Sequence, residues 1–139
     1  MADLSITATS VVTVSGTVIK KVAGETIVAG DAVYVKAADG KAWKMQADGT
    51  SEESGVGVDF GIALNGGSAG QPILFQVDGS VTLGGSTTAK TTSYMVSAAA
   101  GKICPQADLI STNKITYLGY ATDAVGTFVF NKKATGAVV

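Results

Sequence analysis

The side chains that most often carry catalysis or bind metals are scarce in this sequence. It has no histidine and a single cysteine, Cys104, among 139 residues. The chain therefore cannot use Ser-His-Asp or Cys-His catalysis, and it cannot form histidine-containing zinc or iron sites. One thiolate cannot hold a metal cluster. Cys104 cannot form an internal disulfide either, and we expect it to be a small buried hydrophobic residue.

Carboxylates are the remaining candidates for acid–base chemistry. Glu52, Glu53 and Asp59 lie near one another, but Glu52 and Glu53 belong to the polar stretch DGTSEESG, which is typical of a solvated loop. Asp–Gly pairs recur along the chain, and none has the spacing of a calcium loop. We therefore predict no catalytic residue and no metal site, and we do not expect an enzyme.

Glycine-rich segments are the candidates for phosphate binding. Gly55–Gly61 approaches a dinucleotide-binding fingerprint, but it has one residue too many before its last glycine and runs into strand-like residues rather than a helix. The Gly-Lys dipeptides at Lys41 and Lys102 lack the other residues of a P-loop. The sequence thus indicates no cofactor.

Aromatic residues could instead form a platform that stacks on carbohydrate or on single-stranded nucleic acid. Trp43 and the tyrosines are the candidates, but aromatics make up only 6% of the chain and occur at alternating positions of strand-like runs. Packing in a core or an interface is the more ordinary use of such positions. The formal net charge of -1 also provides no field that would attract nucleic acid or acidic lipid, so we expect neither as a partner.

Composition describes an apolar chain with few charges. Charged residues are 15% and hydrophobic residues 46%, so apolar surface must be buried in the chain's own core or against partners. No apolar run approaches the roughly 20 residues of a membrane span. The opening stretch MADLSITATS lacks the basic and apolar regions of a secretory signal.

Short runs rich in Val, Ile, Thr, Tyr and Phe alternate with turn residues along almost the whole sequence. Residues 73–77 alternate in the manner of a strand, and Asp78-Gly79 is typical of a tight hairpin that returns through residues 80–83. No segment has a helical apolar stripe. We predict an all-β fold of short antiparallel strands, arranged as a sandwich or a barrel.

Two parts of the chain repeat one pattern. VYVKAADGKA (33–42) is echoed by YMVSAAAGKI (94–103), and DFGIAL (59–64) by YLGYAT (117–122). A glycine and an apolar strand follow each time. The pattern predicts a single β domain over 23–139 made of two degenerate repeat units, at about 23–79 and 80–139, and it favours architecture over chemistry.

An N-terminal arm over residues 1–22 precedes the repeats. Its dense Thr and Val residues are typical of an edge strand that pairs with a neighbouring subunit, whereas the tail from Lys132 to Val139 looks loose. The candidate partner contacts of the chain are Leu4, Ile6, Val12, Val14, Trp43 and Asn65.

Three segments carry a family resemblance. AGETIVAGDAVYVKAADGKAWKMQADG, GIALNGGSAGQPILFQVDGSVTLGG and LGYATDAVGTFVFNKKATG together resemble small tailed-phage virion proteins, over most of residues 23–136. The resemblance implies a capsid decoration (cement) protein or a head or tail fibre component, with no catalytic or ligand residues. The framework turns, implied by the resemblance except for the last, which comes from the hairpin pattern, are Gly30, Asp31, Gly40, Gly61, Gly70 and Gly79.

The expected function is therefore structural. The resemblance implies a homotrimer that binds the major capsid protein on the outer surface of the head after synthesis in the host cytoplasm. The alternative is a tail, baseplate or fibre component that contacts the host surface and binds glycan through exposed aromatics. Copy number per virion separates the two.

Overall fold

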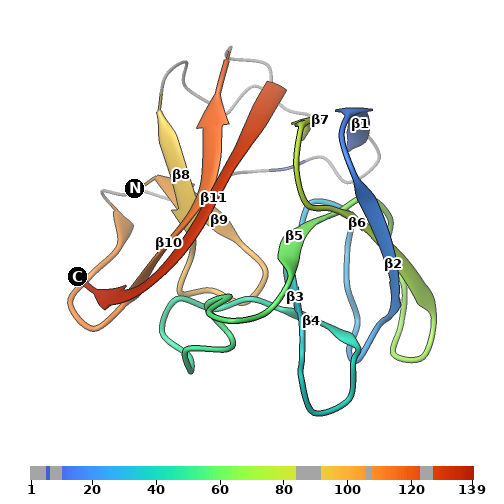
Figure 1. The fold of residues 1–139 in the computed structure, drawn as a ribbon, viewed down its shortest axis with the longest axis horizontal. Helices are drawn as coiled ribbons and strands as arrows, with labels where there is room; N and C mark the ends of the chain where they lie inside the picture. The colour runs from blue at the N-terminus through green and yellow to red at the C-terminus, as the bar shows by residue number, and fades with distance from the viewer. Residues whose placement is uncertain (1–5, 7–10, 84–91, 106–107, 123–126) are drawn as a thin grey trace.

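The chain is all-β. A computed structural model describes residues 6, 11–83, 92–105, 108–122 and 127–139, and none of these lies in an α-helix. The described residues form eleven strands (Figure 1): β1 (Val12–Ser15), β2 (Val18–Val22), β3 (Ala32–Val35), β4 (Ala42–Lys44), β5 (Phe60–Ala63), β6 (Pro72–Gln76), β7 (Ser80–Thr82), β8 (Ser93–Val96), β9 (Ile103–Pro105), β10 (Lys114–Ala121) and β11 (Thr127–Val138).

The strands make two antiparallel sheets. The six-stranded sheet has the order β1-β7-β11-β10-β8-β9, and the five-stranded sheet has the order β2-β6-β5-β3-β4. Each order begins and ends at an edge strand, so neither sheet closes into a barrel. Of the two predicted architectures, the structure is consistent with the sandwich. Figure 1 shows the two sheets side by side, joined where β1 continues into β2 and β6 into β7.

The two sheets repeat one strand order. β2-β6-β5-β3-β4 in one corresponds to β7-β11-β10-β8-β9 in the other. The register repeats as well, because Val33 pairs with Gly61 in the first sheet and Tyr94 pairs with Gly119 in the second, at the positions that the sequence repeat aligns. The boundaries of the two units and of the arm stay predictions.

Gly61 is a strand residue rather than the turn that we expected. It lies within β5, and a Cβ at this position would be 1.9 Å from the backbone oxygen of Gln76 on the adjacent strand. Its counterpart Gly119 is equally close to β11, with 2.0 Å to the oxygen of Val129. Glycine is required at both places because neighbouring backbones approach too closely for any side chain.

A continuous two-stranded ribbon connects the sheets. β1 pairs with β7 from Val12 opposite Thr82, and β2 pairs with β6 as far as Val22 opposite Pro72. Asp78-Gly79 is therefore not the predicted hairpin, since β6 and β7 belong to different sheets and the chain bends there instead of returning. Gly79 does have the expected positive φ, of 81°.

Gln76 holds the bend from inside. It is fully buried, and its side-chain Nε2 lies 2.6 Å from the carbonyl oxygen of Ser15, 2.7 Å from that of Asp78 and 2.8 Å from that of Ser80. These carbonyls belong to both strands of the ribbon. Because buried carbonyls need donors, the two N–H groups of this amide serve carbonyls that the bend removes from regular pairing.

Three apolar clusters stabilise the sheets. The largest takes Tyr34, Phe60 and Ile62 from the five-stranded sheet and many buried residues of the six-stranded sheet, among them Phe128, so it joins the two. A second covers the other face of the five-stranded sheet around Phe75. The smallest contains Met95, Cys104 and Leu109. Cys104 is buried, as expected.

The C-terminal segment is ordered, and the expectation of a loose tail from Lys132 was wrong. β11 runs to Val138 and pairs with β10, with Lys133 opposite Tyr117. Lys132 reaches the other sheet, where its Nζ donates to the backbone oxygen of Phe60 at 2.6 Å and lies 4.6 Å from that ring's centroid. Burial lowers the pKa of Lys132.

Candidate assembly surface

The edge strand β1 presents apolar side chains to solvent. All four of its residues are exposed, with Val12 at 57% and Val14 at 62% of their full accessibility. Among the described strands, β1 has a partner on one side only, β7, because it ends the six-stranded sheet. A valine-rich strand with a free edge is a template for pairing with another chain.

Further apolar side chains are exposed along the same ribbon. Val18 and Val22 are exposed on β2, and Leu74 is exposed on β6 opposite Lys20. We refer to Val12, Val14, Val18, Val22 and Leu74 as the ribbon surface. β2 ends the other sheet, so the described part of the ribbon has an open edge in both sheets, and beyond Val22 that edge is bridged from Ala23 to Ala42.

The other N-terminal candidates differ from Val12 and Val14. Ile6 is partly buried and packs against the largest cluster, where its Cγ2 would lie 2.6 Å from a Cβ at Gly30. Its side chain therefore serves the chain's own core. Leu4 lies outside the described residues.

Trp43 makes its contacts within the chain. Its Nε1 donates to the Asp39 carboxylate at 3.1 Å, and the Lys36 Nζ lies 4.7 Å from the ring centroid. A Cβ at Gly24 would lie only 2.2 Å from the indole. The indole is thus held in place, half-buried, rather than presented as a free platform for a partner.

Asn65 also uses its polar side-chain groups for hydrogen bonds within the chain. Its Oδ1 accepts a hydrogen bond from the Leu74 backbone N–H at 2.6 Å, and its Nδ2 donates to the Pro72 oxygen at 3.3 Å. The side chain extends the pairing of β6 beyond the end of β5. Asn65 thus makes a structural contact, and residue type alone does not distinguish such a contact from one with a partner.

The predicted framework residues other than Gly61 lie at turns or bends. Gly30, Gly40 and Gly70 have positive φ angles of 95°, 67° and 91°. Asp31 is buried, and its Oδ2 accepts the Val28 backbone N–H at 2.9 Å. Burial raises the pKa of Asp31, against the opposing effect of that hydrogen bond and of two lysines.

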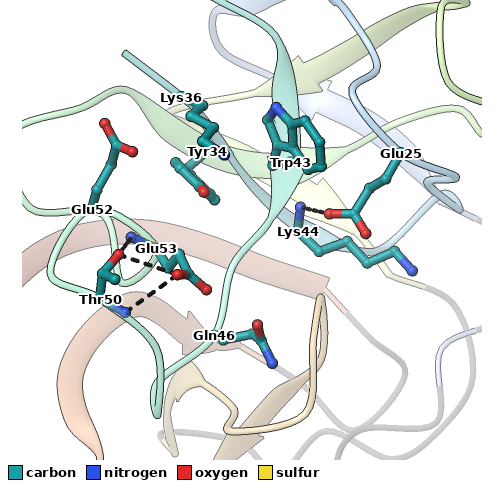
Figure 2. A pocket seen from close by; sticks show the side chains of 9 residues that line it. All are labelled: Glu25, Tyr34, Lys36, Trp43, Lys44, Gln46, Thr50, Glu52 and Glu53. Carbon is teal, nitrogen blue, oxygen red and sulfur yellow. Dashed lines mark hydrogen bonds between the residues drawn. The ribbon is translucent and has the colours of Figure 1, made fainter. Parts of the chain in front are cut away.

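A pocket of about 390 Å³ lies beside Trp43 (Figure 2). Tyr34, Glu25 and Glu53 are among its lining residues, together with two lysines. Glu52 and Glu53 were expected to lie in a solvated loop, with no connection to Glu25, which lies far away in the sequence. Only the folding of residues 50–53 back towards β3 and β4 brings these side chains together.

No further site follows from comparison with known proteins or from the grouping of side chains. No protein-family model matches the chain, and no curated protein matches it. Among the described residues, no three His, Cys, Asp or Glu side chains are grouped so that they could hold a metal ion. Within the same ranges, no helix has the length and apolar character needed to cross a membrane.

Proposed function

We propose that this chain is a structural protein of a tailed-phage virion that decorates the outer surface of the capsid and bridges adjacent major capsid proteins. The observation that carries the proposal is the β1 edge, where Val12 and Val14 are exposed on a strand that, within the described part of the chain, is paired on one side only. Exposed apolar side chains and unpaired backbone groups together are costly in an isolated protein and useful in an assembly.

The remaining features also support such a role. The low net charge of -1 keeps repulsion between closely spaced copies small. Two ordered sheets joined by a bent ribbon form a scaffold, and many identical weak contacts sum to a stable shell through multivalency. A homotrimer that binds the major capsid protein, without nucleic acid or membrane, is part of this proposal and follows from the family resemblance.

The test is the copy number of the chain in purified particles. For a decoration protein we expect on the order of hundreds of copies per virion. Particles that lack this chain should be less resistant to heat or chelation. A handful or a few dozen copies would instead place the chain in the tail, baseplate or a fibre and overturn the proposal. Immunogold labelling of intact particles reports the position independently.

A further inference from the structure

The pocket beside Trp43 is formed by parts of the chain that are separate in sequence. β3 contributes Tyr34, β4 contributes Trp43, and the following loop contributes Glu53, while Glu25 comes from the segment before β3 (Figure 2). In this view the side chains of Tyr34 and Glu53 lie on one side of β4, and Glu25 lies on the other side, next to Lys44. The ribbon surface uses none of these residues.

Tyr34 places a hydroxyl in this pocket without a partner. Its side chain is only 3% exposed, and the hydroxyl points into the space between Glu53 and Trp43 (Figure 2). Among the described residues it makes no hydrogen bond. Burial, with the carboxylates of Glu53, Glu52 and Glu25, raises the pKa of Tyr34 to about 12. A polar group that faces a pocket without a partner from the protein is available to bond with a ligand.

The three glutamates are held in position by one oxygen each. Glu25 Oε2 accepts the Lys44 backbone N–H at 3.0 Å, Glu52 Oε2 accepts the Ala37 N–H at 3.1 Å, and Glu53 Oε1 accepts the Thr50 hydroxyl at 3.2 Å. Within the described part of the chain, the second oxygen of each carboxylate has no hydrogen-bond partner. Preorganised acceptors of this kind bind a donor without first losing side-chain entropy.

The charge balance of the pocket favours a cation. Glu25, Glu52 and Glu53 oppose Lys36 and Lys44, which leaves one net negative charge on the lining. The Lys36 ammonium group is drawn to the Trp43 ring, and the Lys44 side chain extends away from the space in Figure 2. A positive ligand would compensate the remaining charge, whereas a neutral one would leave it unpaired.

We propose that this pocket binds the guanidinium group of an arginine side chain presented by a protein partner. A guanidinium is planar and directs five N–H donors outwards, so it can bond to several separate acceptors, such as those of Glu25, Glu53 and Tyr34, better than a compact ammonium group can. The chain itself contains no arginine, so a second copy cannot supply the group. That the partner is the major capsid protein rests on the proposed function, whereas the pocket's preference does not.

Trp43 is the only tryptophan, so its fluorescence reports on the pocket directly. We expect N-acetyl-arginine amide to change that emission saturably and the neutral analogue N-acetyl-citrulline amide to have little effect. Raising the salt concentration should weaken the arginine signal. Equal responses to arginine and citrulline, or no saturable response, would overturn the proposal. A saturable response to neutral saccharides without one to arginine would assign a carbohydrate instead and overturn it too.

Two variants locate the binding in the pocket. Glu53→Gln should weaken arginine binding about tenfold, because it removes a charged acceptor, and Tyr34→Phe should weaken it about threefold. Asp59→Asn, which removes the same charge from an exposed carboxylate outside the pocket, is the matched control and should leave binding unchanged. If Glu53→Gln and Asp59→Asn bind alike while both remain folded, the pocket assignment is wrong.

The arginine-binding test and the copy-number test of the proposed function can fail independently of each other. Arginine binding with only a few dozen copies per virion would keep the pocket and reject decoration. Hundreds of copies per virion without arginine binding would keep decoration and reject the pocket assignment. Binding of the full-length Glu53→Gln variant to particles stripped of this chain then shows whether the pocket contributes to capsid attachment.

Discussion

Gly16 and Gly79 face each other at the bend of the ribbon, so closely that a Cβ on Gly79 would lie 2.7 Å from the Cα of Gly16. The same Cβ would lie 2.1 Å from the backbone oxygen of Ser15. Both strands of the ribbon pass from one sheet to the other at this point. The contact between two glycine backbones therefore determines whether the two sheets can be joined in this arrangement.

Replacing Gly79 with alanine should destabilise the whole domain. We expect Gly79→Ala to lower the free energy of unfolding by about 3 kcal/mol or more, because it adds a backbone clash to the strain of a positive φ. Gly57→Ala is the matched control, since Gly57 has a φ of 76° and open space around it. That variant should cost only about 1–2 kcal/mol. Urea unfolding measures both, and equal losses would contradict the role of the close contact.

Lys132 should stabilise the contact between the sheets. Lys132→Met keeps most of the aliphatic stem but removes the hydrogen bond to Phe60 and the ring contact, and we expect a loss of about 1–2 kcal/mol. Lys133→Met alters the exposed neighbour on the same strand and should change stability by less than about 0.5 kcal/mol. Thermal unfolding of the two variants compares them directly, and similar shifts would refute the assignment.

Tyr34 should make the protein sensitive to alkaline pH. Its pKa is raised to about 12 in the folded chain, so the unfolded chain, with the ordinary tyrosine pKa near 10, loses this proton first. The stability that Tyr34 contributes is therefore complete below about pH 10 and is lost as the pH rises towards 12. In Tyr34→Phe we expect this part of the pH dependence to vanish.

The absorbance of tyrosinate provides the check on that titration. One of the four tyrosines should ionise late in the folded wild type, and Tyr34→Phe should remove the late-ionising fraction. If the late fraction persists in Tyr34→Phe, another tyrosine is responsible and the expectation fails.

The ribbon surface should mediate both the self-association of the protein and its binding to particles. The double variant Val12→Lys, Val14→Lys places two charges on an exposed edge, so we expect a fold of unchanged stability to within about 1 kcal/mol but loss of the oligomer and of capsid attachment. Ile110→Lys is the control, because Ile110 is 68% exposed and lies outside the ribbon. Light scattering and co-sedimentation with particles report the result. A wild-type protein that remains monomeric would count heavily against the homotrimer.

Much of the fold follows from local patterns that the sequence displays. Gly40, expected as a framework turn, lies between β3 and β4 and has the positive φ that Asp–Gly turns favour. The repeated GK and G-x-A motifs fall at equivalent places of two sheets with one strand order. Strand type and repetition are local properties, so they could be predicted.

The errors arose where a local signal fits two geometries. A positive φ at Gly79 serves a hairpin or a bend equally well, and only the long-range pairing of β1 with β7 selects the bend. The tail after Lys132 has too few apolar residues to read as a strand, yet β10 provides it with a partner. The carboxylates around Tyr34 come together through tertiary contacts that no spacing encodes.

The ribbon also determines the order in which the chain can fold. Thr17 and Asp78, which bond to each other across it, are separated by 61 residues. β1 and β2 therefore leave the ribosome well before β6 and β7 exist, and closing so large a loop slows their pairing further. In that interval the valine-rich strands are open to exchange with other nascent chains. We expect the yield of folded protein in a host cell to depend on chaperones and on the rate of translation.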